Sequence, residues 1–164
     1  MAVVRTPSDI LANVYATPTG QANADYLDGA DVLRKTGTIT VGATDSATSV
    51  YPVCQVSSGD FLMDIAYINT ALGTSAAASL GLYQPNTSTA VSIALFATTL
   101  SMVAATTVPT SVRYTNLTAT SANKRVWELL GLSKDPGIFY DLAWTLTTAG
   151  TGGGTIATLV SYSK

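Results

Sequence analysis

Two acidic side chains come nearest to a catalytic arrangement in this sequence. Asp60 and Asp64 stand four positions apart in a segment that alternates like a β-strand. Residues four apart on a strand share a face and lie about 13 Å apart. An inverting glycosidase holds its two carboxyl groups at roughly 6.5–9.5 Å. We therefore interpret the pair as separate surface carboxylates and not as a general acid and base.

The other acidic and glycine-rich segments match no binding motif. Asp25, Asp28 and Asp31 surround Gly29, but their spacing departs from that of an EF-hand calcium loop. The glycines of residues 150–154 are not followed by the Lys of a phosphate-binding loop. The chain has no histidine, which excludes Ser-His and Cys-His catalysis and most zinc sites. We predict no catalytic, cofactor-binding or metal-binding residues and no enzymatic activity.

The single cysteine, Cys54, cannot form a disulfide within the chain. It lies in the apolar, strand-like run of residues 50–56. This setting favours a small buried side chain over a nucleophile.

Charged residues are scarce. They make up 11% of the chain, the net charge is −2, and Lys and Arg never form a run. A nucleic-acid binder needs a basic stripe, and a peripheral membrane anchor needs a basic cluster, so neither partner is predicted. Protein surfaces are commonly about 25–35% charged, so this composition indicates that other protein covers much of the surface.

Residues 91–108 form an apolar run long enough to cross a membrane as a helix. The run is rich in Ser and Thr and has no flanking Lys or Arg near its ends. We therefore expect two short strands joined at Thr98 and Thr99.

Composition and periodicity predict an all-β fold. The chain is 47% hydrophobic, is rich in Thr and has 13 glycines, which suits strands separated by tight turns. Eight or nine short strands predict a β-sandwich or jelly roll. The expected strands are residues 38–41, 49–56, 61–69, 79–84, 91–97, 100–104, 111–115, 140–148 and 155–163.

The last two segments, residues 140–148 and 155–163, are predicted to form a hairpin across a Gly-rich turn. Trp144 alternates with Leu142 and Leu146 and should be buried. The segment 61–69 alternates as well, and its expected core face carries Phe61, Met63, Ile65 and Tyr67.

One helix is expected, at residues 123–132, with Trp127 and Leu130 on the face that docks against the sandwich. Residues 1–35 lack periodicity and contain turn signals, so we expect an extended N-terminal arm with a helical turn at residues 8–14. The sandwich domain should then span residues 36–164. A polar arm of this kind can become ordered on a neighbouring subunit.

Two stretches carry a resemblance to a known family. The first is SVYPV at residues 49–53, leading to LGLY at residues 80–83; the second is VWELLGL at residues 126–132, leading to YDLA at residues 140–143. Together they resemble small virion proteins of tailed bacteriophages, which are encoded near the capsid genes and are similar to jelly-roll capsid decoration (cement) proteins.

This resemblance implies a non-enzymatic structural subunit without cofactors, commonly a homotrimer. It implies the major capsid protein as partner, the outer capsid surface of the virion as location, and the host cytoplasm during assembly. The alternative is a receptor- or carbohydrate-binding jelly roll of a head fibre or tail-associated adhesin. The aromatic and amide side chains that a sugar-binding site needs occur in residues 83–86 (YQPN) and 114–116 (YTN).

Overall fold

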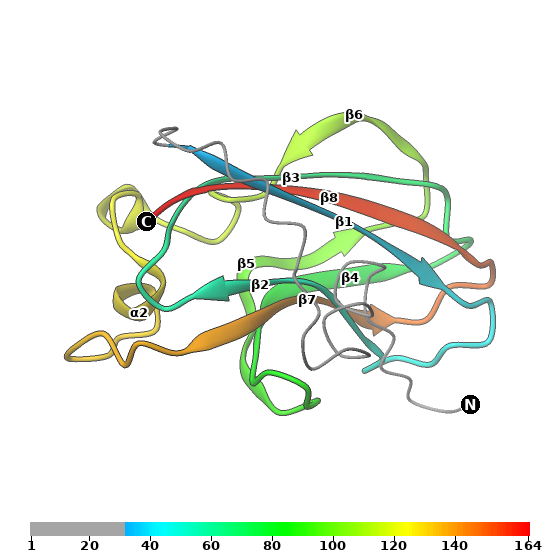
Figure 1. Ribbon diagram of the computed structural model, residues 1–164. Coiled ribbons are helices and arrows are strands. Elements are labelled where there is room, and N and C mark those ends of the chain that lie inside the picture. Colours follow the sequence, from blue (N-terminus) through cyan, green and yellow to red (C-terminus); the bar gives the residue numbers. More distant parts are fainter. Residues whose placement is uncertain (1–31) are drawn as a thin grey trace.

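The computed structural model describes residues 32–164, which form two four-stranded antiparallel sheets (Figure 1). The expected turn at residues 8–14 and the group Asp25, Asp28 and Asp31 lie outside the described residues. One sheet has the strand order β1-β8-β3-β6 and the other β2-β7-β4-β5. The strands are β1 (Leu33–Val41), β2 (Val50–Ser57), β3 (Phe61–Asn69), β4 (Ala77–Tyr83), β5 (Ala90–Ser101), β6 (Thr106–Ser111), β7 (Phe139–Thr148) and β8 (Gly154–Ser163).

This strand order is that of a jelly roll, in which eight strands form two Greek keys. The predicted all-β sandwich is therefore confirmed. The first strand begins at Leu33, so residues 33–35, which the sequence had placed in the arm, belong to the sheet and pair with β8.

The core between the sheets is organised around Trp144, which is fully buried as predicted. Its indole Nε1–H donates to Thr158 Oγ1 at 2.9 Å, so one hydrogen bond joins β7 of one sheet to β8 of the other. The ring of Tyr67 packs against the indole with a centroid distance of 5.2 Å. Leu142 and Leu146 lie in the same cluster, as their alternation with Trp144 predicted.

The predicted hairpin of residues 140–148 and 155–163 is wrong, because the two strands lie in opposite sheets. β7 pairs with β2 and β4, whereas β8 pairs with β1 and β3. The link between them crosses from one sheet to the other. A Cβ at Gly150 would lie 2.0 Å from the carbonyl oxygen of Leu72, so close backbone approach explains the glycine there.

Residues 91–108 lie in β5, in β6 and in the turn that joins them, but Thr98 and Thr99 are not that turn. β5 runs on to Ser101, and Thr99 lies at a register shift against β4 with φ +48°. Its amide N–H donates to Ser79 Oγ at 3.0 Å. The two threonines thus mark a β-bulge, and the chain turns later, before Thr106.

A second bulge corrects the predicted core face of β3. The register shifts between Leu62 and Asp64, at Met63. Leu62 is therefore buried, while Met63 is exposed. Beyond the bulge, Ile65 and Tyr67 face the core as predicted.

The expected helix at residues 123–132 is much shorter. A 3-10 turn, η1 (Ala119–Ser121), precedes α2 (Val126–Leu129). Val126 is the buried residue of α2. Leu130 packs against the core as predicted, whereas Trp127 is only partly buried and does not belong to that cluster, so its predicted docking is wrong. The backbone N–H of Trp127 donates to Ser58 O at 2.9 Å, which attaches α2 to the β2–β3 turn.

Candidate docking surface

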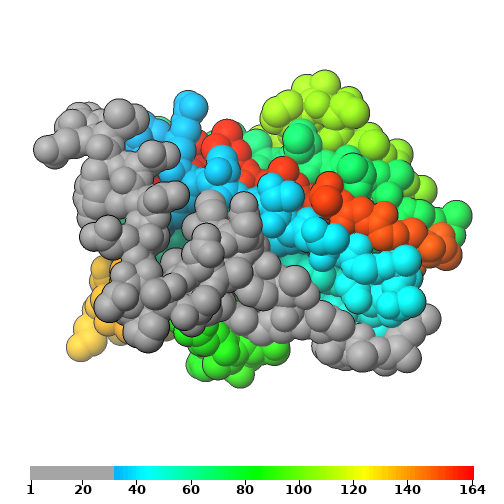
Figure 2. Space-filling model, turned by 45° about the vertical axis from the view of Figure 1, so that its right-hand side comes forward, coloured from blue at the N-terminus to red at the C-terminus, as the bar shows by residue number. Residues whose placement is uncertain are grey.

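The outer face of the sheet β1-β8-β3-β6 carries uncharged side chains in two rows that run across three strands. Thr36, Leu159 and Ala66 are register partners in the first row. Thr38, Ala157 and Ile68 are partners in the second row. Figure 2 shows β1, β8 and β3 side by side across this face. We call these six residues the neutral patch.

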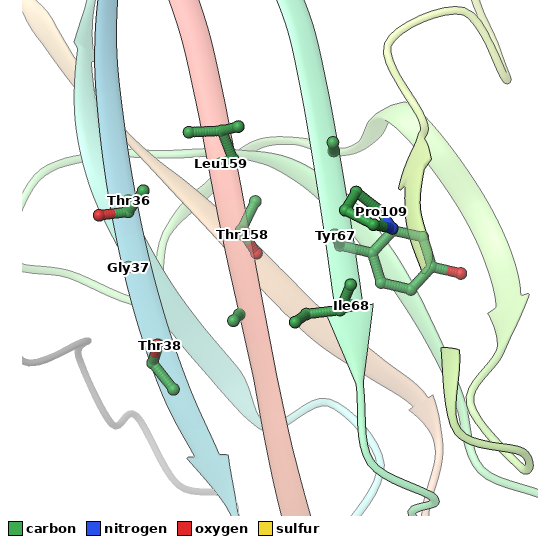
Figure 3. A pocket seen from close by; sticks show the side chains of 10 residues that line it. Thr36, Gly37, Thr38, Tyr67, Ile68, Pro109, Thr158 and Leu159 are labelled. Carbon is green, nitrogen blue, oxygen red and sulfur yellow. The ribbon is translucent and has the colours of Figure 1, made fainter. Parts of the chain in front are cut away.

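A shallow groove of about 160 Å³ runs over the neutral patch (Figure 3). Ile68, 38% exposed, and Pro109 of β6 border it on one side, and Thr36 and Thr38 on the other. No charged residue lines this groove. The complete lining is Thr36, Gly37, Thr38, Ala66, Tyr67, Ile68, Pro109, Ala157, Thr158 and Leu159.

Charged residues of this face lie beside the neutral patch. Ser161 of β8 has Arg34 and Asp64 as its register partners on the two neighbouring strands. Asp64 accepts a hydrogen bond from Ser111 Oγ at 2.5 Å. The centre of a protein interface is depleted in charged residues and its rim is polar, and the arrangement on this face follows that pattern.

A second, more open cleft of about 760 Å³ lies at one end of the other sheet. Gln84 and Pro85, which the sequence offered for sugar binding, line it together with Gln55. Phe139, 55% exposed, and Ile138 supply its apolar surface. Exposed aromatic and amide groups together can bind a sugar or an extended peptide.

The aromatic and amide residues that the sequence offered for sugar binding are less available to a ligand than expected. Tyr83 is buried, and its hydroxyl is hydrogen-bonded to Thr145 Oγ1 at 2.6 Å. Asn116 donates both to Ala94 O at 2.7 Å and to Thr98 Oγ1 at 2.5 Å, so its amide holds β5. Tyr114 is exposed, but it lies over the guanidinium of Arg113.

Asp60 and Asp64 are not brought together as a catalytic pair. Asp60 is buried in the β2–β3 turn, where its carboxylate accepts the N–H of Ser57 at 2.8 Å. Burial raises the pKa of Asp60, and its hydrogen bond with Ser57 opposes the shift. Asp64 lies beyond the bulge with its own partner, Ser111. The two carboxylates therefore have different structural roles.

The described residues contain no helix that is long and apolar enough to span a membrane. Within residues 32–164, no three His, Cys, Asp or Glu side chains gather as metal ligands would.

Cys54 is buried in the core cluster, and burial raises the pKa of its thiol to about 12. At pH 8 only on the order of one thiol in ten thousand would then be the reactive thiolate. We expect iodoacetamide at pH 8 to leave Cys54 of the folded protein unmodified and to alkylate it fully in urea, as measured by intact mass. Rapid alkylation of the folded protein would contradict this placement.

No family model matches the sequence, and no curated protein sequence matches it. Among solved structures, the chain is similar to a chain in the capsid of Ralstonia phage GP4, with a TM-score of 0.65 and 14% identity over 98% of both chains. The chain shares its fold with a phage capsid component. A second similarity is to a chain of the cyanophage Pam1 capsid asymmetric unit, with a TM-score of 0.47 and 14% identity over 81% of this chain and 84% of that one. The similarity to the Ralstonia phage GP4 capsid chain supports the resemblance to small phage virion proteins at the level of the fold.

Sequence reasoning missed the neutral patch. A signal for it was present, because residues 36 and 38 of β1 and residues 157 and 159 of β8 are uncharged at their outward-facing positions. Which strands lie side by side was not apparent from the sequence, so the two rows could not be assembled.

Proposed function

We propose that this chain is a non-enzymatic structural protein that decorates and stabilises a phage capsid by binding the lattice of the major capsid protein. The observation that carries this proposal is the fold shared with a capsid chain over 98% of both chains. The neutral patch supports it, because it offers an uncharged surface for contact with another protein. The proposed location is the outer surface of the virion, after assembly in the host cytoplasm.

The proposed assembly is a homotrimer seated on the lattice. Only 11% of the residues are charged, so attachment should depend on apolar and backbone contacts more than on electrostatic steering. A subunit that binds only the mature shell stabilises that shell by mass action.

Adding the purified protein to capsids that lack it tests this function. We expect it to bind and to raise the temperature at which the particles release their DNA. Binding should change little between 0.1 and 0.5 M NaCl, because few charge pairs are available for salt to screen. An unrelated β-sandwich protein of similar size serves as the control. Absence of binding, or binding without any gain in particle stability, would contradict the proposal.

The second candidate function is that of an adhesin. The cleft lined by Gln55, Gln84 and Phe139 favours it, since an exposed ring and amide groups are what a sugar site needs. A glycan array on the isolated protein tests this function directly. Particles that lack the protein, remain fully robust and fail to adsorb to host cells would favour the adhesin over the decoration protein.

A further inference from the structure

Arg113 is a buried cation whose charge has no counterpart in the described part of the chain. Its side chain is 0% exposed. Its Nε–H donates to the carbonyl oxygen of Leu62 at 2.6 Å. The two terminal nitrogens, Nη1 and Nη2, have no hydrogen-bond partner within residues 32–164.

The position of Arg113 explains why it is enclosed. It follows β6 in a segment that joins the two sheets: the N–H of Val112 donates to Ile65 O of β3 at 2.8 Å, and the N–H of Asn116 donates to Phe96 O of β5 at 3.2 Å. The guanidinium lies over the buried ring of Phe96, with its Cζ 5.9 Å from the ring centroid.

Such an arrangement is unfavourable for the isolated subunit. A buried charge needs a partner, and burial lowers the pKa of the Arg113 guanidinium because it disfavours the charged form. Cation–π contacts with the aromatic rings of Phe96 and Tyr114 replace part of the hydration that the guanidinium loses on burial. They do not satisfy the N–H groups on Nη1 and Nη2.

The Nη1 and Nη2 groups of Arg113 have the geometry of a carboxylate-binding site. Since Nε is fixed by Leu62, the guanidinium is held in one orientation with its two terminal nitrogens available side by side. A carboxylate matches this fork with its two oxygens, and its single charge neutralises the guanidinium. A phosphate would bring more than one negative charge into the same buried position.

Tyr114 is an exposed residue in contact with this guanidinium. The centroid of its ring lies 5.1 Å from the Arg113 Cζ, and the residue as a whole is 51% exposed. No hydrogen bond from its side chain to residues 32–164 is observed, so rotation of the ring toward solvent breaks none of the described bonds.

We propose that Arg113 is a carboxylate receptor that Tyr114 closes in the free subunit, and that it pairs with an acidic side chain of the capsid lattice when the subunit attaches. The partner in this inference rests on the proposed function. The structural basis is the fully buried guanidinium, whose two terminal nitrogens have no partner among residues 32–164 and which lies against the exposed residue Tyr114.

The first experiment compares attachment with stability. Arg113→Met should weaken attachment to capsids by about 30-fold or more, because it leaves the lattice carboxylate without its partner. The same change should leave the urea midpoint of the free subunit unchanged or raise it, because it replaces an unpaired buried charge by an apolar chain. Arg113→Lys should also weaken attachment, since an ammonium group lacks the fork. Lys124→Met, which removes an exposed cation nearby in the sequence, is the matched control and should attach like the wild type.

The second experiment needs no capsid. Tyr114→Ala uncovers the guanidinium, so sodium acetate should raise the Tm of this variant more than sodium chloride does at equal ionic strength. In the double variant with Arg113→Met the difference should disappear. This comparison tests carboxylate recognition by Arg113 alone.

The outcomes separate the alternatives. If Arg113→Met lowers both attachment and the urea midpoint, Arg113 serves only as a structural bridge between the sheets, and the inference is overturned. Normal attachment of Arg113→Met, or no acetate effect in Tyr114→Ala, would overturn it as well. Failure of the wild-type protein to bind capsids would defeat the proposed function and the assigned partner, whereas a positive acetate result would still establish the receptor.

Discussion

Replacing Trp144 by Ala should lower the free energy of unfolding by about 3–5 kcal/mol, the range for large-to-small changes in a closed core. The indole is fully buried, contacts Tyr67 and joins the two sheets through Thr158. Its removal leaves a cavity and also leaves the Thr158 hydroxyl without its partner. Urea denaturation of the purified protein, followed by circular dichroism, measures the loss.

Two variants serve as controls for this result. Trp127→Ala makes the same chemical change at a half-buried position and should cost less than half as much. Thr158→Val keeps the indole but removes its acceptor, and should cost about 1–3 kcal/mol, the penalty for an unsatisfied buried donor. A loss under about 1 kcal/mol for Trp144→Ala would mean that the ring does not hold the sheets together.

The burial of Trp144 could be predicted because it depends on local alternation. The side chains of a strand alternate between its two faces, so Leu142, Trp144 and Leu146 had to share one face. Leu80 and Leu82 of β4 follow the same alternation and lie in the same core cluster. The fold class followed from the number and spacing of such segments.

The pairing of strands could not be predicted in this way. β7 and β8 are adjacent in sequence, alternate well and are joined by a Gly-rich link, yet they lie in different sheets. The glycine signal at Gly150 has another cause, the close approach of the Leu72 carbonyl. Alternation indicates which side of a strand is buried, but it does not say which strand lies beside it.

β-Bulges limit the prediction of which side chains of a strand face the core. One extra residue at Met63 reverses the alternation, so Phe61 and Met63 were assigned to the core when Leu62 lies there. At Thr99 the extra residue was interpreted as a turn. A β-bulge leaves no residue type as specific as the glycine of a tight turn, and neither bulge was visible in the sequence.

The candidate sites were the least predictable part of the molecule. Arg113 stands beside Tyr114 in a loop, and nothing in the sequence indicates that its guanidinium is enclosed between the sheets. Asp60 and Asp64 were the nearest approach to a catalytic pair by their type and spacing. The structure gives each of them a separate hydrogen-bond partner. The prediction that the chain has no catalytic residues stays a prediction.

Placing a charge at the centre of the neutral patch should weaken attachment to capsids strongly without unfolding the protein. Ala157 lies between Thr38 and Ile68 on neighbouring strands, and its side chain faces away from the core. Ala157→Glu adds a carboxylate that would lose its hydration when another protein covers the patch. We expect attachment to weaken by about 30-fold or more, as measured by cosedimentation with capsids that lack the protein.

In the free subunit the new carboxylate remains in water, so the free energy of unfolding from urea denaturation should change by no more than the roughly 0.5 kcal/mol of an ordinary surface substitution. Ser133→Glu is the matched control, because it adds the same charge at an exposed position in the loop that follows α2 and should attach normally. Weak attachment of both variants would point to a general effect of negative charge, such as repulsion from an acidic shell. Normal attachment of Ala157→Glu would show that the lattice contact lies elsewhere, and the cleft bordered by Gln84 and Phe139 would then be the next surface to test.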